Sequence, residues 1–241
     1  MQIRKSNERG HANRGWLDSY HSFSFSNYYD PQWMGYSVLR VINEDVIAPA
    51  KGFGMHSHND MEIITYVLQG NLAHKDSLGN TEVIRQGHVQ RMTAGTGITH
   101  SEFNASDSEP VHLLQIWITP NLQNLTPSYE DKFFEDEQKL NQWCLLASEK
   151  GEQDSLIVHQ DIALYASKLN EQNQLEYVLK HNRSGYLQVA SGALAINVEK
   201  DGEINTQRLN AGDAALFDSA QTIAIKAIDN AEILLFDLPA T

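Results

Sequence analysis

Short apolar runs separated by turn residues recur along most of this chain, and they predict β-strands. The runs are rich in Val, Ile, Leu, Tyr and Phe, and Gly, Asn or Asp bounds them at intervals of about ten residues. In the first half the predicted strands cover residues 38–43, 53–58, 63–69, 81–85, 87–92, 99–104 and 112–119, with a hairpin connection at 77–80. Many short, regularly spaced strands are typical of an all-β barrel or sandwich.

The pattern breaks at residues 120–142 and then resumes. This segment is charge-rich, contains the turn signal Thr-Pro-Ser at 126–128 and holds no run of period two. We expect a connector with at most one short helix there, with a surface loop of a single domain as the alternative. Strand-like runs return at 162–169, 175–179, 186–189, 194–198, 214–217, 223–228 and 232–238. We therefore expect two β-rich domains, residues 1–130 and 131–241, whose similar glycine spacing fits a diverged duplication.

The composition is that of an ordinary globular protein, with 41% hydrophobic and 20% charged residues. The net charge of −13 argues against direct nucleic-acid binding, because phosphate binding needs clustered Lys and Arg. No apolar run is long enough for a membrane span, the N-terminus has no apolar signal segment, and the single Cys144 excludes an intrachain disulfide. We expect a cytoplasmic protein without a membrane partner.

Two histidines, His56 and His58, stand two residues apart in one predicted strand. On a strand, side chains at i and i+2 share a face and lie about 6.5–7 Å apart. Two imidazoles at that spacing can converge on one ion, because metal–nitrogen distances are about 2.1 Å. Alone, the pair is a weak signal, since two ordinary histidines on a polar strand face give the same pattern.

A second pair with the same spacing, His100 and Glu102, lies in another predicted strand, and glycines precede it as expected at a barrel corner. Two strands that each present two donors on one face can supply three imidazoles and one carboxylate to a single ion. We therefore predict a metal site made of His56, His58, His100 and Glu102. Such donors suit divalent Fe, Mn, Co, Ni, Cu or Zn.

The two segments resemble the two cupin motifs, and more narrowly the chain resembles the pirin family. The resemblance is closest to bacterial members described as quercetin 2,3-dioxygenases. It includes Met92-Thr-Ala-Gly-Thr-Gly97 and Leu114-Gln-Ile-Trp117. The other matching stretches are 7–16, 22–25, 29–31, 39–43, 53–58, 61–70, 74–77, 100–102 and 158–161.

This resemblance implies an all-β bicupin, with two stacked double-stranded β-helix (jelly-roll) barrels, few short helices, a metal in the N-terminal barrel and a degenerate C-terminal barrel. Eight of the ten histidines precede residue 120, which agrees with that asymmetry. Four protein ligands leave coordination positions open, and Fe(II) with open positions is the usual setting for dioxygen chemistry, so Fe(II) is the expected metal.

The resemblance also implies the flavonol quercetin and dioxygen as partners, with cleavage between C2 and C3 and release of carbon monoxide. Two other classes stay open. One is a non-enzymatic, redox-responsive metal-binding module with a protein partner. The other is a cupin enzyme that acts on another small phenolic or keto substrate.

The identity of the carboxylate ligand needs an argument, because many cupins use the acid of the first motif, here Glu62. A straight strand would put Glu62 about 13 Å from His58, too far to share an ion unless the chain bends at residues 59–60. In pirin-like proteins the ligand is the residue that matches Glu102, so we expect Glu102 to bind the metal, and it could also take a substrate proton. Glu62 would then orient a ligand, or be an ordinary hydrogen-bonded strand carboxylate.

Alternation predicts an apolar substrate slot lined by Phe53, Met55, Met92 and Trp117. The aromatic residues between 23 and 33 either cap a pocket mouth or pack in the interior. The remaining candidates are expected in ordinary roles: packing or capping for His11 and His21, surface positions for His74, Asp76 and His88, a strand start with a possible supporting role for His112, and a structural role between the halves for His159 and Asp161.

Overall fold

The computed structural model describes residues 1–200 and 203–240, and nearly every regular element in them is a β-strand. The helical elements there are α1 (Asp136–Lys139) and two 3-10 turns, at Ser6–Glu8 and Glu152–Asp154. None of these described helices is long and apolar enough to cross a membrane. The all-β class predicted from the sequence is therefore confirmed.

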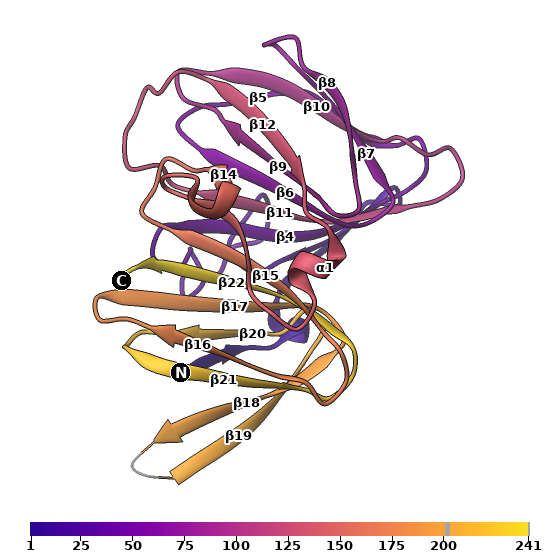
Figure 1. Ribbon diagram of the computed structural model, residues 1–241. Helices are drawn as coiled ribbons and strands as arrows, with labels where there is room; N and C mark the ends of the chain where they lie inside the picture. Colours follow the sequence, from indigo (N-terminus) through magenta and orange to yellow (C-terminus); the bar gives the residue numbers. More distant parts are fainter. Residues whose placement is uncertain (201–202, 241) are drawn as a thin grey trace. The chain divides into compact units, whose positions relative to one another are not determined.

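The chain forms two compact units (Figure 1). The N-terminal unit consists of Gly10–Phe134 and Glu149–Gln160, and the C-terminal unit consists of Met1–Arg9, Glu135–Ser148 and Asp161–Thr241. Each unit thus draws on more than one segment, whereas the domains expected from the sequence are continuous.

Two antiparallel sheets make up the N-terminal unit. The larger has the order β12-β9-β6-β11-β4-β3-β2 and the smaller β5-β10-β7-β8. The strands of the larger sheet are β2 (Gly10–Asn13), β3 (Leu17–His21), β4 (Leu39–Ile47), β6 (Glu62–Gln69), β9 (His88–Thr93), β11 (Val111–Ile118) and β12 (Ser128–Phe133). The smaller sheet contains β5 (Gly52–His58), β7 (Asn71–Asp76), β8 (Thr81–Arg85) and β10 (Ile98–Asn104). A short strand, β14 (Leu156–Ile157), lies in the second segment of the unit.

An apolar cluster fills one end of the space between these two sheets. Because strand side chains alternate between faces, each sheet turns one set of residues toward the other. The cluster joins residues of both sheets: Leu17, Ile47, Val67, Val111 and Leu113 from the larger, and Leu72 and Ile84 from the smaller. The unit is therefore a two-sheet sandwich of the kind that the alternation predicts.

The C-terminal unit repeats this arrangement. Within this unit, the larger sheet has the order β1-β20-β17-β22-β15-β13 and the smaller sheet β16-β21-β18-β19. The strands are β1 (Gln2–Arg4), β13 (Cys144–Ser148), β15 (Ala163–Leu169), β16 (Gln174–Leu179), β17 (Arg183–Ser191), β18 (Ala193–Lys200), β19 (Glu203–Asn210), β20 (Ala214–Phe217), β21 (Gln221–Ala227) and β22 (Ala231–Pro239). The chain's first strand belongs here because it pairs with β20.

The prediction of a plain connector at residues 120–142 is wrong. Strand β12 lies inside this segment and pairs with β9 along its whole length. It is an edge strand, and edge strands are often charged, so it lacks the apolar alternation that marks the others. The single short helix expected in the segment is α1. The predicted ranges also missed seven other strands, of which β7 proves important for the site: β1, β2, β3, β7, β13, β14 and β19.

Candidate metal centre

Strands β5 and β10 pair side by side and bring three imidazoles together. His100 lies directly opposite His56, and Ile98 lies opposite His58. The ring centroids are 4.8 Å apart for His56 and His58, 4.4 Å for His56 and His100, and 4.9 Å for His58 and His100. One ring nitrogen of each histidine lies within 4.8 Å of the others, so all three can reach one ion.

A β-bulge next to these histidines turns an aromatic ring toward them. Regular antiparallel pairing would set Gly54 opposite Glu102, but Phe53 takes that place. Strand β5 therefore holds one extra residue there, which reverses its alternation. As a result the Phe53 ring lies 6.3 Å from the ring of His56.

The hydrogen bonding of the trio fits a bound ion. His100 is 1% exposed, and neither of its ring nitrogens has a hydrogen-bond partner among the described residues. Nδ1 of His56 lies 2.8 Å from the carbonyl oxygen of Gly54, which leaves Nε2 to bind a metal. Buried polar atoms in proteins are nearly always partnered, and an ion would supply the partner that His100 lacks. These residues therefore fit a single divalent transition metal.

Burial also keeps two of the imidazoles neutral. It lowers the pKa of His58 to about 4, and the nearby His100 and His56 lower it further. Burial, followed by the charges of His56 and His74, lowers the pKa of His100 to about 3. Neutral imidazole is the form that binds metals, so these two side chains need lose no proton to bind one at neutral pH.

Glu102 lies beside the trio in a neighbouring group of donors. Both of its carboxylate oxygens accept hydrogen bonds from Nε2 of Gln115, at 3.2 and 3.1 Å. One oxygen of this carboxylate and one ring nitrogen each of His74 and His100 lie within 4.8 Å of one another. The structure thus brings three of the four predicted ligands together and places the fourth next to them. The complete four-residue ligand set stays a prediction.

The expectation that His74 and Asp76 are exposed is wrong, because they are only 1% and 5% exposed. Strand β7 pairs with β10, which sets His74 opposite Glu102 and Asp76 opposite His100. Nδ1 of His74 accepts a hydrogen bond from Nε2 of Gln90 at 2.9 Å, so its Nε2 carries the proton and donates to Asp76 at 3.0 Å. The sequence shows that His74 and Asp76 are two residues apart, but not that their strand pairs with β10.

A row of polar side chains crosses the inner face of the larger sheet at the level of the site. Its members, here called the polar row, are cross-strand neighbours in the order His21, Asn43, Gln115, Thr65 and Gln90. Nδ1 of His21 lies 2.9 Å from Oδ1 of Asn43, and Oγ1 of Thr65 donates to Oε1 of Gln115 at 2.8 Å. Since Gln115 and Gln90 also bind the smaller sheet, the row fixes the orientation of side chains beside the histidines.

A cavity of about 260 Å³, here called the inner cavity, lies next to the histidines. Two of the four residues predicted to line an apolar slot, Phe53 and Trp117, line this cavity, whereas Met55 and Met92 do not. Met55 has the opposite strand parity to the histidines and is 60% exposed, and Met92 is buried in a separate apolar cluster. The other lining residues are Ala12, Arg14, Leu17, Ser19, His21, Phe25, Ser26, Asn43, Asp45, His56, His58, Glu102 and Gln115.

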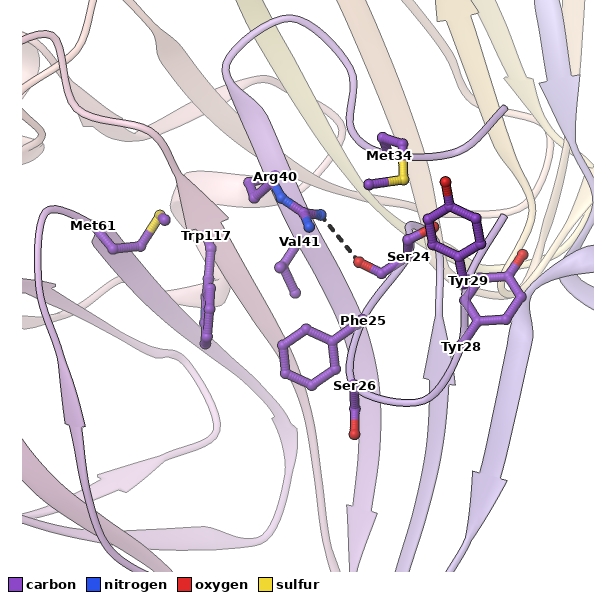
Figure 2. Close-up of a pocket in the computed structure, with 10 residues that line it drawn as sticks. All are labelled: Ser24, Phe25, Ser26, Tyr28, Tyr29, Met34, Arg40, Val41, Met61 and Trp117. Atoms are coloured by element: carbon purple, nitrogen blue, oxygen red, sulfur yellow. Dashed lines mark hydrogen bonds between the residues drawn. The ribbon is translucent and has the colours of Figure 1, made fainter. Parts of the chain in front are cut away.

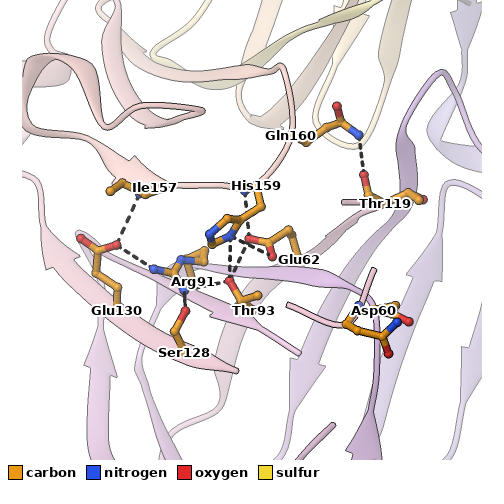
Figure 3. Close-up of polar contacts among 11 residues, drawn as sticks. Asp60, Glu62, Arg91, Thr93, Thr119, Ser128, Glu130, Ile157, His159 and Gln160 are labelled. Atoms are coloured by element: carbon orange, nitrogen blue, oxygen red, sulfur yellow. Dashed lines mark hydrogen bonds and ion pairs between the residues drawn. The ribbon is translucent and has the colours of Figure 1, made fainter. Parts of the chain in front are cut away.

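Glu62 is a hydrogen-bonded strand carboxylate and orients no metal ligand (Figure 3). Its Oε2 accepts a hydrogen bond from Oγ1 of Thr93 at 3.1 Å, and its Oε1 lies 3.4 Å from Nδ1 of His159. Burial raises the pKa of Glu62, and Thr93 and His159 oppose that rise. The orienting role fails because Glu62 begins β6 in the larger sheet, rather than continuing β5 toward the histidines.

The other histidines have ordinary contacts. His11 stacks on Tyr20, with ring centroids 4.3 Å apart. Nδ1 of His88 lies 3.4 Å from a carboxylate oxygen of Asp131, and Nε2 of His112 lies 3.0 Å from Oε1 of Glu44. None of these described contacts involves the histidine trio.

Comparisons with known proteins agree with this geometry. The Pirin family model matches residues 2–118, and the model of the quercetinase C-terminal cupin domain matches residues 145–238. A quercetin 2,3-dioxygenase of Escherichia coli (strain K12) is 47% identical over 99% of both chains. A pirin-like protein of Caulobacter vibrioides is 40% identical over 95% of both chains.

Solved structures point the same way. A bacterial pirin from Escherichia coli in complex with nickel(II) is 46% identical, with a TM-score of 0.90 over 100% of this chain and 99% of that one. The sandwich units and the histidine trio define a protein of the cupin class. Within that class, this chain belongs to the pirin family.

Proposed function

We propose that this chain is a metal-dependent dioxygenase of pirin type that cleaves quercetin between C2 and C3 and releases carbon monoxide. The observation that carries this proposal is the trio of close imidazoles at a cavity with aromatic walls. Relatives named quercetin 2,3-dioxygenase, with full-length similarity to this chain, support it.

In this proposal His56, His58, His100 and Glu102 hold one divalent ion, with Fe(II) as the native metal. The nickel complex of the related bacterial pirin supports a divalent ion in this family, and Mn, Co, Cu or Zn would use the same donors. When bound, such an ion supplies Lewis-acid and oxygen chemistry and offsets developing negative charge. A cytoplasmic location and the absence of a direct nucleic-acid partner stay predictions from composition.

The chain's own residues would bind and orient the flavonol. Phe53 and Trp117 offer flat apolar surfaces, and the Trp117 ring lies 5.0 Å from the ring of His58. A planar aromatic held between them would lie beside the trio, which lowers the entropic cost of reaction. Gln115 fixes the Glu102 carboxylate, which can bind the ion or accept the proton of the 3-hydroxyl.

Oxygen consumption and carbon monoxide release with quercetin test this proposal. Protein reconstituted with Fe(II) should turn quercetin over, and His56→Ala should abolish turnover because one of three close imidazoles is lost. His181→Ala is the matched control, since His181 is exposed and lies in the C-terminal unit. Unchanged turnover in His56→Ala, or none in the reconstituted wild type, would contradict the proposal. Tight metal binding without turnover would instead indicate the regulatory module, and turnover of other phenols alone would indicate a different cupin enzyme.

A further inference from the structure

A second cavity of about 270 Å³, here called the outer cavity, lies in the N-terminal unit, and Figure 2 shows the residues that line it. Phe25, Ser26 and Trp117 line both cavities. The rings of Phe25 and Trp117 meet edge to face, with centroids 5.4 Å apart. The two cavities therefore share one wall, and an extended ligand lying along it would place one end in each.

Arg40 is the cationic residue that lines the outer cavity, and its charge has no acidic partner among the contacts of the described residues. Its guanidinium makes one hydrogen bond there, from Nη1 to the carbonyl oxygen of Ser24 at 3.0 Å. A guanidinium has five N–H donors in a planar fork, so most of them stay available to a ligand. By contrast, Arg91 and Arg183 each bind carboxylates.

The loop that carries the aromatic side of the outer cavity is well anchored. Oγ of Ser24 donates to the carbonyl oxygen of Asp30 at 2.9 Å and accepts from the backbone N–H of Asp30 at 2.8 Å. Phe23 and Trp33 in the same loop are buried, with ring centroids 6.4 Å apart. Of the two roles predicted for these aromatics, packing holds for Phe23 and Trp33. The pocket role applies instead to Phe25, Tyr28 and Tyr29.

The carboxylate of this loop, that of Asp30, already has other partners. Oδ2 of Asp30 lies 3.4 Å from the hydroxyl of Tyr28, and Oδ1 accepts from the backbone N–H of Gln32 at 3.0 Å. Arg40 is therefore a partly buried cation beside apolar and aromatic walls, with N–H donors available to an anionic ligand.

We propose that the outer cavity binds the acidic end of an extended aromatic substrate, with Arg40 as the counter-ion and the ring held in the inner cavity. The ligand class is an aryl anion, an aromatic molecule that bears a sulfonate or carboxylate away from the reacting ring. This inference rests on the proposed function for the position of the ring, and it narrows the substrate class to acidic phenolics.

The test compares two probes, quercetin and quercetin sulfonated on its distal ring. Anaerobic binding of each is followed by tryptophan fluorescence in metal-free and in nickel-loaded full-length protein. Wild type should bind the sulfonated probe about tenfold more tightly, because charge-assisted hydrogen bonds are worth roughly that factor or more. The preference should appear in both metal states, since Arg40 is not part of the predicted metal site.

Arg40→Gln should abolish the preference, and Arg40→Lys should keep part of it because lysine retains a point charge without the planar fork. Arg85→Gln is the matched control, as it removes one exposed positive charge from β8 and should leave the preference intact. Equal affinity of wild type for the two probes would overturn the inference even if Arg40→Gln fails to fold. A preference that survives in Arg40→Gln would overturn it as well.

A separate assay in air distinguishes this failure from failure of the proposed function. Quercetin turnover without any charge preference would remove only the Arg40 subsite. A charge preference without quercetin turnover would keep the subsite and remove the quercetinase activity.

Discussion

The two units share one strand order but fill the space between their sheets differently. In the N-terminal unit the polar row, His21, Asn43, Gln115, Thr65 and Gln90, crosses the inner face of the larger sheet. In the C-terminal unit a corresponding row of cross-strand neighbours is mostly aliphatic: Tyr165, Leu235, Leu187 and Ala215. All four belong to, or pack against, one large apolar cluster.

The smaller sheets differ in the same way. Strands β5 and β10 present imidazoles and a carboxylate, whereas β16 and β21 pair Leu175 with Ile225 and Tyr177 with Ile223. These four side chains also contribute to the apolar cluster. One topology thus supports either a filled core or a polar interior with a cavity. The choice depends on which residues occupy the inward positions, since burial of polar groups is tolerated only when they are partnered.

The largest effect should come from the central ligand of the polar interior. His100→Ala removes the most buried imidazole of the trio, and we expect metal affinity to fall by roughly 100-fold or more, beyond the 10–100-fold typical of residues that only support a ligand. Titration with nickel(II) and elemental analysis measure this. His181→Ala should bind metal like wild type. Retention of one tightly bound metal by His100→Ala would show that the trio is not the site.

A polar side chain substituted into the mostly aliphatic row of the C-terminal unit should destabilise that unit. Leu235→Gln buries an unpartnered amide at a fully buried position and loses apolar burial, so we expect a loss of about 3 kcal/mol in the free energy of unfolding. Hydrogen exchange of peptides from β17 and β22 reports this loss. Leu235→Met, which preserves volume, should cost less than about 1.5 kcal/mol. Similar exchange in both variants would contradict this explanation.

The opposite kind of substitution, an apolar residue placed in the polar row, tests what that row does. Gln115→Leu removes the donor to both oxygens of Glu102 and the acceptor of the Thr65 hydroxyl. We expect metal affinity to fall about 10-fold, the lower end of the effect of residues that orient a ligand. Gln69→Leu, at an exposed position of β6, is the control. If affinity is the same in both variants, Gln115 does not position Glu102.

The smallest effect concerns pH. Burial raises the pKa of Asp45 to about 7, opposed by the hydrogen bond from Ser19 and assisted by the charge of Glu102. Because the pKa in the folded state exceeds that of the unfolded chain, Asp45 favours folding at low pH. This contribution is lost as the pH rises from about 4 through about 7.

Asp45→Asn should therefore weaken the decline in stability of the N-terminal unit between pH 5 and pH 8. Denaturant unfolding at several pH values, with hydrogen exchange to separate the units, measures the slope. Asp229→Asn changes the net charge equally at an exposed position and should leave the slope unaltered. An identical slope in wild type and Asp45→Asn would show that Asp45 is ionised in the folded protein.

Predictions from sequence succeeded where the physical rule is local. Side chains two apart on a strand share a face, so the spacing of His56 and His58 was enough to place them together. The same rule sets Met55 on the face away from the histidines, where it is exposed, and it failed for Phe53, which a bulge in β5 turns toward them. It also missed β12, whose charged edge position hides its strand character. Glu62 shares the strand parity of His58 but lies in the other sheet, so parity alone does not bring the two side chains together.

The amino-acid sequence by itself determined the all-β class, most of the strands and the shared face of His56 and His58, because each follows from alternation within a few residues. Only the tertiary structure decided that Gln115 holds Glu102, that His74 is buried next to His100, and that Arg40 lines a cavity adjoining the site. Those contacts join residues from different strands and loops. They depend on sheet order and register, which the burial of the whole inner face selects and no short segment encodes.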